Sequence, residues 1–239
     1  CIKINNRKVL TGMAEICGFP DKVVDITVAI DKIDKIGLEA VEAEMLEKGL
    51  TAEAVEVIRP VLTLSGTTSE KIAVMRDLMN GKSASGIVSE TGLKGLDELE
   101  ELFGFIEAAG IRHEVEIDLS LARGLNYYTG AIFEVKAKDF AIGSICGGGR
   151  YDGLVEQMGG PKTAALGFAV GLERLNMIMQ AQGCEVPQEK TCDVYIAPMG
   201  DNAAKMALKL ATMLREEGFT VTAYAKLYHK SLWQNVKFP

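Results

Sequence analysis

The apolar spacing changes near residue 110, and this change constrains the fold more than any other feature of the chain. Before it, apolar residues recur at helical intervals in residues 52–62, 69–79 and 95–109. After it, polar and apolar residues alternate over residues 113–119, as is typical of a half-buried strand. Because one segment cannot satisfy both periods, the sequence predicts an α+β chain. A helical tract over residues 22–109 interrupts a mixed, mainly antiparallel sheet.

Strand-like segments lie on both sides of the helical tract. The predicted strands are residues 1–5, 113–119, the apolar segment that ends at Val135, 141–146 and 165–170. The middle three follow one another without a helix between them, which predicts an antiparallel meander. Helices are predicted over residues 6–18 and 172–181, the second with Leu172, Leu175 and Met179 facing inward.

The helical tract contains no pattern that indicates catalysis. Thr68 or Ser69 is placed to cap the helix over residues 69–79. Gly110 stands at the end of the helix over residues 95–109. The acidic side chains of that helix are interpreted as a solvated face.

The last part of the chain reads as a separate β-α-β unit. Residues 183–191 are polar, contain Pro187 and are interpreted as a linker. A strand over 193–198 and another over 219–225 flank a helix with Asp201 or Asn202 as its cap. Its apolar face is predicted to hold Ala203, Met206, Leu210 and Leu214. The two strands should be parallel, with a right-handed crossover.

Composition narrows the class of protein. The 239 residues are 48% hydrophobic with a net charge of −7, which argues against a surface that wraps nucleic acid. No apolar run reaches the roughly 18–20 residues that span a bilayer, and no signal peptide is expected. Five cysteines without a Cys-x-x-Cys pair and only two histidines make a zinc site unexpected. We expect a cytoplasmic protein with free thiols, and the start at Cys1 suggests that the chain begins inside a domain.

Residues 122–135 are the strongest candidate for a binding site. Arg123 stands at a glycine-marked bend and can bind two oxygens of a phosphate or carboxylate at once. Tyr127 and Tyr128 follow, each with an apolar ring and a polar tip. In a regular strand only one of them could face a pocket, unless the chain bends at residues 126–129. From these residues alone, a surface hairpin with half-buried tyrosines stays open as the alternative.

Two further segments carry candidate ligand-binding residues. The glycines at 147, 148 and 149 would let a ligand or another backbone approach closely, although flexible loops contain such runs too. They fit neither the P-loop nor the dinucleotide fingerprint. Arg174 lies in the first turn of a predicted helix, where an anion is favoured. The alternative role for Arg174 is a surface ion pair with Glu173 or Asp152.

Taken together, these segments resemble the histidyl-tRNA synthetase family. Residues 122–135 resemble its signature Arg-Gly-Leu-Asp-Tyr-Tyr-Thr-Gly-x-x-Phe-Glu, and residues 146–154 resemble its Gly-Gly-Arg-Tyr-Asp-Gly-Leu turn. Residues 167–175 resemble the third class II synthetase motif, and Ile4-Asn5-Asn6-Arg7 resembles the segment after the second. The resemblance extends from residue 1 to about residue 225.

The resemblance implies a specific ligand contact for each of these residues. Arg123 would contact the α-phosphate of ATP and the carboxylate of histidine, and Arg174 would bind the γ-phosphate end. Tyr127 and Tyr128 would help to hold the histidine. Gly148, Gly149 and Tyr151 would line the amino-acid pocket.

The family also implies cofactors, partners and domains. ATP would bring Mg²⁺ with it, with no metal bound by the protein itself, and the partners would be histidine, tRNA(His) and, in the full-length protein, a second copy. The implied parts are residues 1–21 in the catalytic domain, 22–109 as a helical insertion domain, 110–182 as the catalytic core, 183–191 as a linker, and 192–239 as a partial α/β anticodon-binding domain.

Four departures from the family bear on activity. Asn126 stands where aspartate is usual, and residues 227–239 do not resemble the family's continuation. The first two class II motifs would precede residue 1, and about half of the anticodon domain would follow the chain's end. We therefore expect a fragment with little adenylation of its own. Two alternatives stay open: a synthetase-like regulatory subunit of histidine biosynthesis, and a tRNA-sensing module attached to a kinase.

Overall fold

The computed structural model describes residues 1–122, 127–184, 192–199 and 203–223 of the chain. It divides the chain into two compact units, residues 1–183 and 184–239. The predicted fold class is confirmed, since a mainly antiparallel sheet combines with helices in the first unit. Within the described residues, no helix is both long enough and apolar enough to span a bilayer. The finer domain boundaries proposed from the sequence stay predictions.

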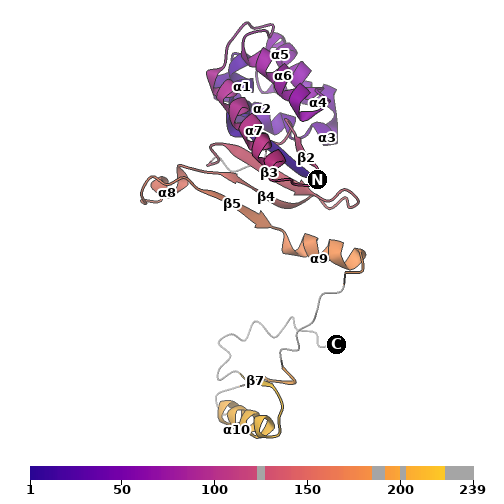
Figure 1. Ribbon diagram of the computed structural model, residues 1–239, viewed down its shortest axis with the longest axis vertical. Coiled ribbons are helices and arrows are strands. Elements are labelled where there is room, and N and C mark those ends of the chain that lie inside the picture. The colour runs from indigo at the N-terminus through magenta and orange to yellow at the C-terminus, as the bar shows by residue number, and fades with distance from the viewer. Residues whose placement is uncertain (123–126, 185–191, 200–202, 224–239) are drawn as a thin grey trace. The chain divides into compact units, whose positions relative to one another are not determined.

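The first unit places seven α-helices before most of its strands. Its strands are β1 (Ile2–Asn6), β2 (Val115–Ile117), β3 (Ala131–Lys136), β4 (Ser144–Arg150) and β5 (Leu166–Val170). Its helices are α1 (Arg7–Ile16), α2 (Val23–Ile30), α3 (Ile33–Ile36), α4 (Leu38–Glu47), α5 (Ala52–Leu62), α6 (Thr68–Met79), α7 (Glu90–Ala108), α8 (Leu154–Gln157) and α9 (Leu172–Ala181), with a 3₁₀ turn over Pro20–Lys22. Helices α1 to α7 gather on one side of the sheet (Figure 1).

The order of strands in the sheet corrects the predicted meander. The order is β2-β1-β3-β4-β5, so β1 lies between β2 and β3. β1 pairs parallel with β2 and antiparallel with β3, whereas β3, β4 and β5 form antiparallel neighbours. A parallel pair needs a long crossover, and the helical tract between β1 and β2 provides it. The strand predicted over residues 113–119 is limited to three residues.

The helical core is closely packed around α1 and α7. Leu10, Met13 and Ile16 of α1 are fully buried, as are Leu96 and Leu99 of α7. Glycine permits this contact, because a Cβ atom on Gly12 would lie 2.5 Å from the Cα atom of Gly92. Two backbones can therefore approach more closely than side chains would allow.

The N-termini of two helices differ from the sequence prediction. Thr67, and not Thr68 or Ser69, caps α6: its hydroxyl accepts from the backbone N–H of Glu70, whose carboxylate accepts from Thr67 N in return. This reciprocal pair is a capping box. Helix α7 begins at Glu90, five residues before its predicted start, because Ser89 accepts from Gly92 N.

The buried faces of α9 and α10 also differ from prediction. In α9, Ile178 is buried and the predicted Leu175 and Met179 are half-buried, whereas the predicted Leu172 is 71% exposed. In the second unit, parallel strands β6 (Val194–Ile196) and β7 (Val221–Ala223) flank α10 (Ala203–Glu216), as predicted. The buried residues of α10 are Ala207 and Ala211, and Met206 and Leu210 are exposed. The predicted cap at Asp201 or Asn202 lies outside the described residues.

Candidate functional site

Three tyrosine rings gather where β3 begins and β4 ends. The antiparallel register pairs Ile132 with Gly149, so residues just before β3 lie beside those just after β4. The ring centroids of Tyr127 and Tyr128 are 4.7 Å apart. The ring of Tyr151 lies 5.5 Å from that of Tyr127 and 6.1 Å from that of Tyr128. Residues 127–129 are not strand, so the adjacent tyrosines are not forced onto opposite faces, and both join one cluster.

The surroundings of Tyr128 raise the pKa of its phenol. Burial raises the pKa of Tyr128, and the hydrogen bond with Tyr127 and the phenols of Tyr127 and Tyr151 add to the effect, bringing it to about 12. Like any tyrosine hydroxyl at neutral pH it is uncharged, and it can both donate and accept a hydrogen bond. Such a group suits a ligand with a polar ring atom.

A cavity of about 150 Å³ lies beside this cluster. The residues that line it are Leu121, Tyr128, Ile132, Phe133, Glu134, Ser144, Gly147 and Gly148. Two of the predicted histidine-binding residues, Tyr128 and Gly148, are among them, while Tyr127 and Tyr151 contact Tyr128 through their rings. The cavity is small beside the roughly 300–1,000 Å³ of pockets for drug-sized ligands, so it suits an amino-acid-sized molecule better than a nucleotide.

Glu134 in the cavity wall was not singled out from the sequence. It lies on β3 opposite Gly147 and is only 5% exposed. Its Oε2 atom lies 3.7 Å from the Nζ atom of Lys136. A buried carboxylate favours a nearby cation or hydrogen-bond donor. One feature of the sequence could have identified it: Glu134 is two residues after Ile132, so both side chains lie on the same face of an otherwise apolar strand.

The three adjacent glycines form part of strand β4, which corrects their interpretation as a turn or loop. A Cβ atom on Gly148 would lie 2.2 Å from the carbonyl oxygen of Gly167, and one on Gly149 would lie 2.9 Å from the Tyr128 ring. A Cβ atom on Gly147 would meet no atom closer than 3.5 Å, the carbonyl oxygen of Phe133. Gly148 and Gly149 are therefore required by neighbouring backbone and ring atoms, whereas a Cβ atom on Gly147 would make only ordinary van der Waals contacts.

Arg174 lies in the first turn of α9, as predicted. Its Nη1 atom donates a hydrogen bond to the carbonyl oxygen of Ser144, a residue that lines the cavity. In the part of the chain that the structure describes, no carboxylate forms an ion pair with Arg174, and Asp152 pairs instead with Arg150 at 2.8 Å. Its exposed guanidinium keeps donors for an anionic ligand.

Arg123 and Asn126 lie outside the described residues. The predicted contacts of Arg123 with phosphate and carboxylate stay predictions. The residues that border it are described: Ala122 is buried on one side, and Tyr127 belongs to the tyrosine cluster on the other.

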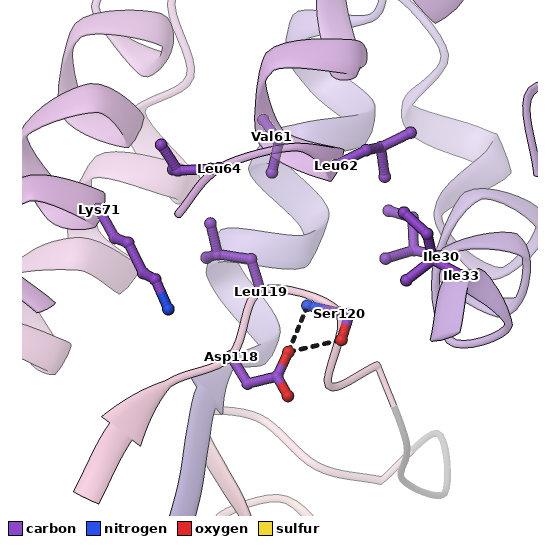
Figure 2. A pocket seen from close by; sticks show the side chains of 9 residues that line it. All are labelled: Ile30, Ile33, Val61, Leu62, Leu64, Lys71, Asp118, Leu119 and Ser120. Atoms are coloured by element: carbon purple, nitrogen blue, oxygen red, sulfur yellow. Dashed lines mark hydrogen bonds between the residues drawn. The ribbon is translucent and has the colours of Figure 1, made fainter. Parts of the chain in front are cut away.

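A second pocket of about 130 Å³ lies between the helices and the turn that follows β2 (Figure 2). Asp118 stands at its polar end and accepts hydrogen bonds from Lys3 Nζ at 2.5 Å and from the backbone N–H of Ser120 at 3.0 Å. Burial alone would raise the pKa of Asp118, but the hydrogen bonds from Lys3 and Ser120 outweigh it and lower the pKa. The polar groups here already have partners within the chain, so we assign this pocket a structural role.

Metal-ligating side chains do not gather at either pocket. Over the described parts of the chain, no three histidine, cysteine, aspartate or glutamate residues are placed to hold a metal ion together.

Comparison with known proteins identifies the family. A sequence model of the family described as Histidyl-tRNA synthetase matches residues 7–175. The histidine–tRNA ligase of Bacteroides fragilis is 43% identical over 241 aligned residues, which cover 99% of this chain and 52% of that protein. The chain thus spans about half the length of the curated relatives that it matches.

Solved structures agree in fold. The crystal structure of histidyl-tRNA synthetase from Nostoc sp. PCC 7120 superposes with a TM-score of 0.69 at 30% identity, covering 97% of this chain and 54% of that one. A Bacillus halodurans structure titled as an ATP phosphoribosyltransferase regulatory subunit/histidyl-tRNA synthetase has a TM-score of 0.59 at 21% identity, with 97% and 55% covered. At that identity the likeness concerns the fold alone. On the family match over residues 7–175, this chain belongs to the histidyl-tRNA synthetase family.

Proposed function

We propose that this chain forms part of an enzyme that charges tRNA(His) with histidine at the expense of ATP. The observation that carries the proposal is the tyrosine cluster beside a small cavity, in a chain of the histidyl-tRNA synthetase family. Histidine would occupy the cavity, with its imidazole near the hydroxyl of Tyr128 and the carboxylate of Glu134. The neutral phenol and the buried acid would each suit one imidazole nitrogen.

The first half-reaction needs placement more than acid–base chemistry. A carboxylate oxygen of histidine, already ionised, would form a bond to the α-phosphorus of ATP while the bond to the pyrophosphate oxygen breaks. Pyrophosphate leaves with the electron pair, and histidyl-adenylate remains. Positioning and stabilisation of charge on the phosphoryl oxygens then supply most of the rate. Arg123 would serve the α-phosphate and Arg174 the γ-phosphate end.

The second half-reaction transfers histidine to tRNA. A hydroxyl of the terminal ribose would attack the carbonyl carbon of the adenylate, and AMP would leave. Mg²⁺ would arrive on the phosphates of ATP, where it neutralises charge. We further propose that the full-length protein acts as a cytoplasmic homodimer and that the unit after residue 183 contributes to anticodon binding.

Histidine-dependent exchange between ATP and pyrophosphate tests this proposal. It would be measured for this chain and for a chimera that supplies the part of the Bacteroides fragilis relative that the chain does not match. We expect exchange by the chimera and little or none by the 239 residues alone. Arg123→Ala in the chimera should lower exchange by about 10²–10³-fold, the usual loss when a donor to developing charge is removed. Arg112→Ala, an exposed arginine before β2, is the matched control.

The other outcomes separate the alternatives. A chimera that binds histidine but stays silent would contradict catalysis and favour the regulatory subunit. Exchange by the 239 residues alone, lost in Arg123→Ala, would place a complete site in this chain, contrary to our expectation.

A further inference from the structure

Thr129 ties together the two segments that carry the tyrosine rings. Its backbone N–H donates a hydrogen bond to the carbonyl oxygen of Arg150 at 2.8 Å. Its side-chain Oγ1 accepts one from the backbone N–H of Asp152 at 3.1 Å. These two bonds flank Tyr151 on both sides in sequence, and Tyr128 immediately precedes Thr129. One residue thus joins both halves of the cluster.

The bonds lie where the strand ladder stops. The last pair between β3 and β4 is Ile132 with Gly149, so the ladder itself does not fix the residues beyond it. Each segment has its own backbone bond to another part of the chain, from Arg7 N–H to the Gly130 carbonyl at 2.9 Å and from Tyr151 N–H to the Ala165 carbonyl at 2.8 Å, but neither bond joins the two segments to each other. The backbone bond of Thr129 continues the pairing of the two segments to Arg150. Its hydroxyl continues the pairing to Asp152, the residue after Tyr151.

An ion pair between Arg150 and Asp152 fixes the segment after β4 from within. The Arg150 Nε atom donates to both carboxylate oxygens of Asp152, at 3.0 and 2.8 Å. The Arg150 side chain lies over Gly130, where an added Cβ atom would be 3.2 Å from the arginine Cδ atom. Asp152 is therefore held by its side chain from Arg150 and by its backbone from Thr129. Arg150 and Asp152 belong to one segment. Within the described residues, the Thr129 hydroxyl is the group of the Tyr127–Tyr128 segment that bonds directly to Asp152.

We propose that Thr129 is a positioning residue: its hydroxyl holds Tyr151 against Tyr127 and Tyr128 and so keeps the amino-acid pocket in its binding shape. The consequence for histidine rests on the proposed function, whereas the placement of the rings does not. The competing explanation is that this hydroxyl only stabilises an exposed turn. The two differ in what its removal changes, ligand affinity or stability alone.

Two substitutions separate the hydroxyl from the shape of the side chain. Thr129→Val keeps the size and branching but removes the acceptor, and Thr129→Ser keeps the acceptor but removes the methyl group. Thr63→Val is the matched control, since the Thr63 hydroxyl also bonds to a backbone group, the carbonyl oxygen of Arg59 at 3.2 Å, within the helical tract. Thr129 is exposed, so the valine variant should fold.

The measurement is a histidine titration of the 239-residue chain labelled with ¹³C in its tyrosine rings. The same samples report the nuclear Overhauser effect between the rings of Tyr127 and Tyr151, whose centroids lie 5.5 Å apart. We expect Thr129→Val to lose this ring contact and to bind histidine about fivefold more weakly, the effect of one net hydrogen bond. Thr129→Ser and Thr63→Val should match the parent in both, and all variants should melt near the parent temperature.

The other outcomes either overturn the proposal or leave the ring contact alone to decide it. Retention of the ring contact in Thr129→Val overturns it, whatever the affinity. Equal losses in the valine and serine variants overturn it as well, because the methyl group would then be responsible. If the parent chain binds no histidine, the 239 residues alone do not form the amino-acid site, and the proposed function is decided by the chimera. The ring contact then decides the positioning claim alone: its loss in valine and retention in serine support the claim.

Discussion

Two contacts in the first unit depend on glycine, yet they do different things. Between α1 and α7, a Cβ atom on Gly12 would lie 2.5 Å from the Cα atom of Gly92. Between β4 and β5, one on Gly148 would lie 2.2 Å from the carbonyl oxygen of Gly167. In both places backbones approach more closely than side chains would permit.

The surroundings of the two contacts differ in burial. Leu10 beside the helix contact is fully buried, whereas Phe168 and Leu166 on β5 are 66% and 73% exposed. The helix contact therefore closes a core, and the strand contact leaves a cavity and exposed side chains beside it. Stability should be concentrated in the first region, and ligand binding in the second.

The largest expected effect sets one leucine from each region against the other. Leu10→Ala should lower the free energy of unfolding by about 2–5 kcal/mol, because it opens a cavity in a closed core. Leu172→Ala removes the same atoms from a side chain that is 71% exposed, and should change stability by less than about 0.5 kcal/mol. Urea unfolding followed by circular dichroism measures both. Equal losses of unfolding free energy in the two variants would contradict the contrast in burial.

A carboxylate in the turn after β2, Asp118, should make the stability of the first unit depend on pH. Asp118→Asn keeps the shape but weakens the hydrogen bonds from Lys3 and Ser120, at a cost of about 1.5–3 kcal/mol at pH 7. The pKa of Asp118 is lowered in the folded state, so its charge stabilises the fold above the unfolded pKa of about 3.9. That contribution is lost as the pH falls through the folded pKa.

The test compares parent and variant at two pH values. The stability gap between parent and Asp118→Asn should be large at pH 7 and should shrink progressively below about pH 4. Asp139→Asn, an exposed aspartate in the turn after β3, should show no such gap. A gap of constant size at both pH values would mean that side-chain shape, and not charge, holds this turn.

Local patterns predicted the helices better than the pairing of strands. The bounds of α5 and α9 agree with the predicted residues 52–62 and 172–181, because apolar spacing marks them within one segment. The position of β1 between β2 and β3 was missed, since strand pairing depends on residues more than a hundred positions apart. The inward face of α9 was predicted in part: Leu175 and Met179 are half-buried beside Ile178, whereas Leu172 is exposed, because spacing shows which residues share a face but not how far along the helix packing extends.

The arrangement of the candidate site could be predicted in part from local patterns. The tyrosines at 127, 128 and 151 could be selected from their sequence context, and the structure brings their rings together. Glu134 was not predicted as a site residue, because a single acidic residue in a strand is expected to face solvent until its burial is known. Sequence alone could not separate the glycines, because their difference lies in atoms of β3 and β5.

The adjacent glycines of β4 give the smallest and sharpest test of the comparison. Gly148→Ala should cost about 1–3 kcal/mol, since its Cβ atom would push against the backbone of β5. Gly147→Ala introduces the same atom one residue earlier, with no neighbour closer than 3.5 Å, and should leave stability unchanged within about 0.5 kcal/mol. Urea unfolding measures the loss, and hydrogen exchange of the β4 and β5 amides shows where it occurs. A Gly148→Ala chain as stable as the parent would mean that β5 moves aside at little cost. The strand contact would then be a loose edge of the sheet and not a counterpart of the helix contact.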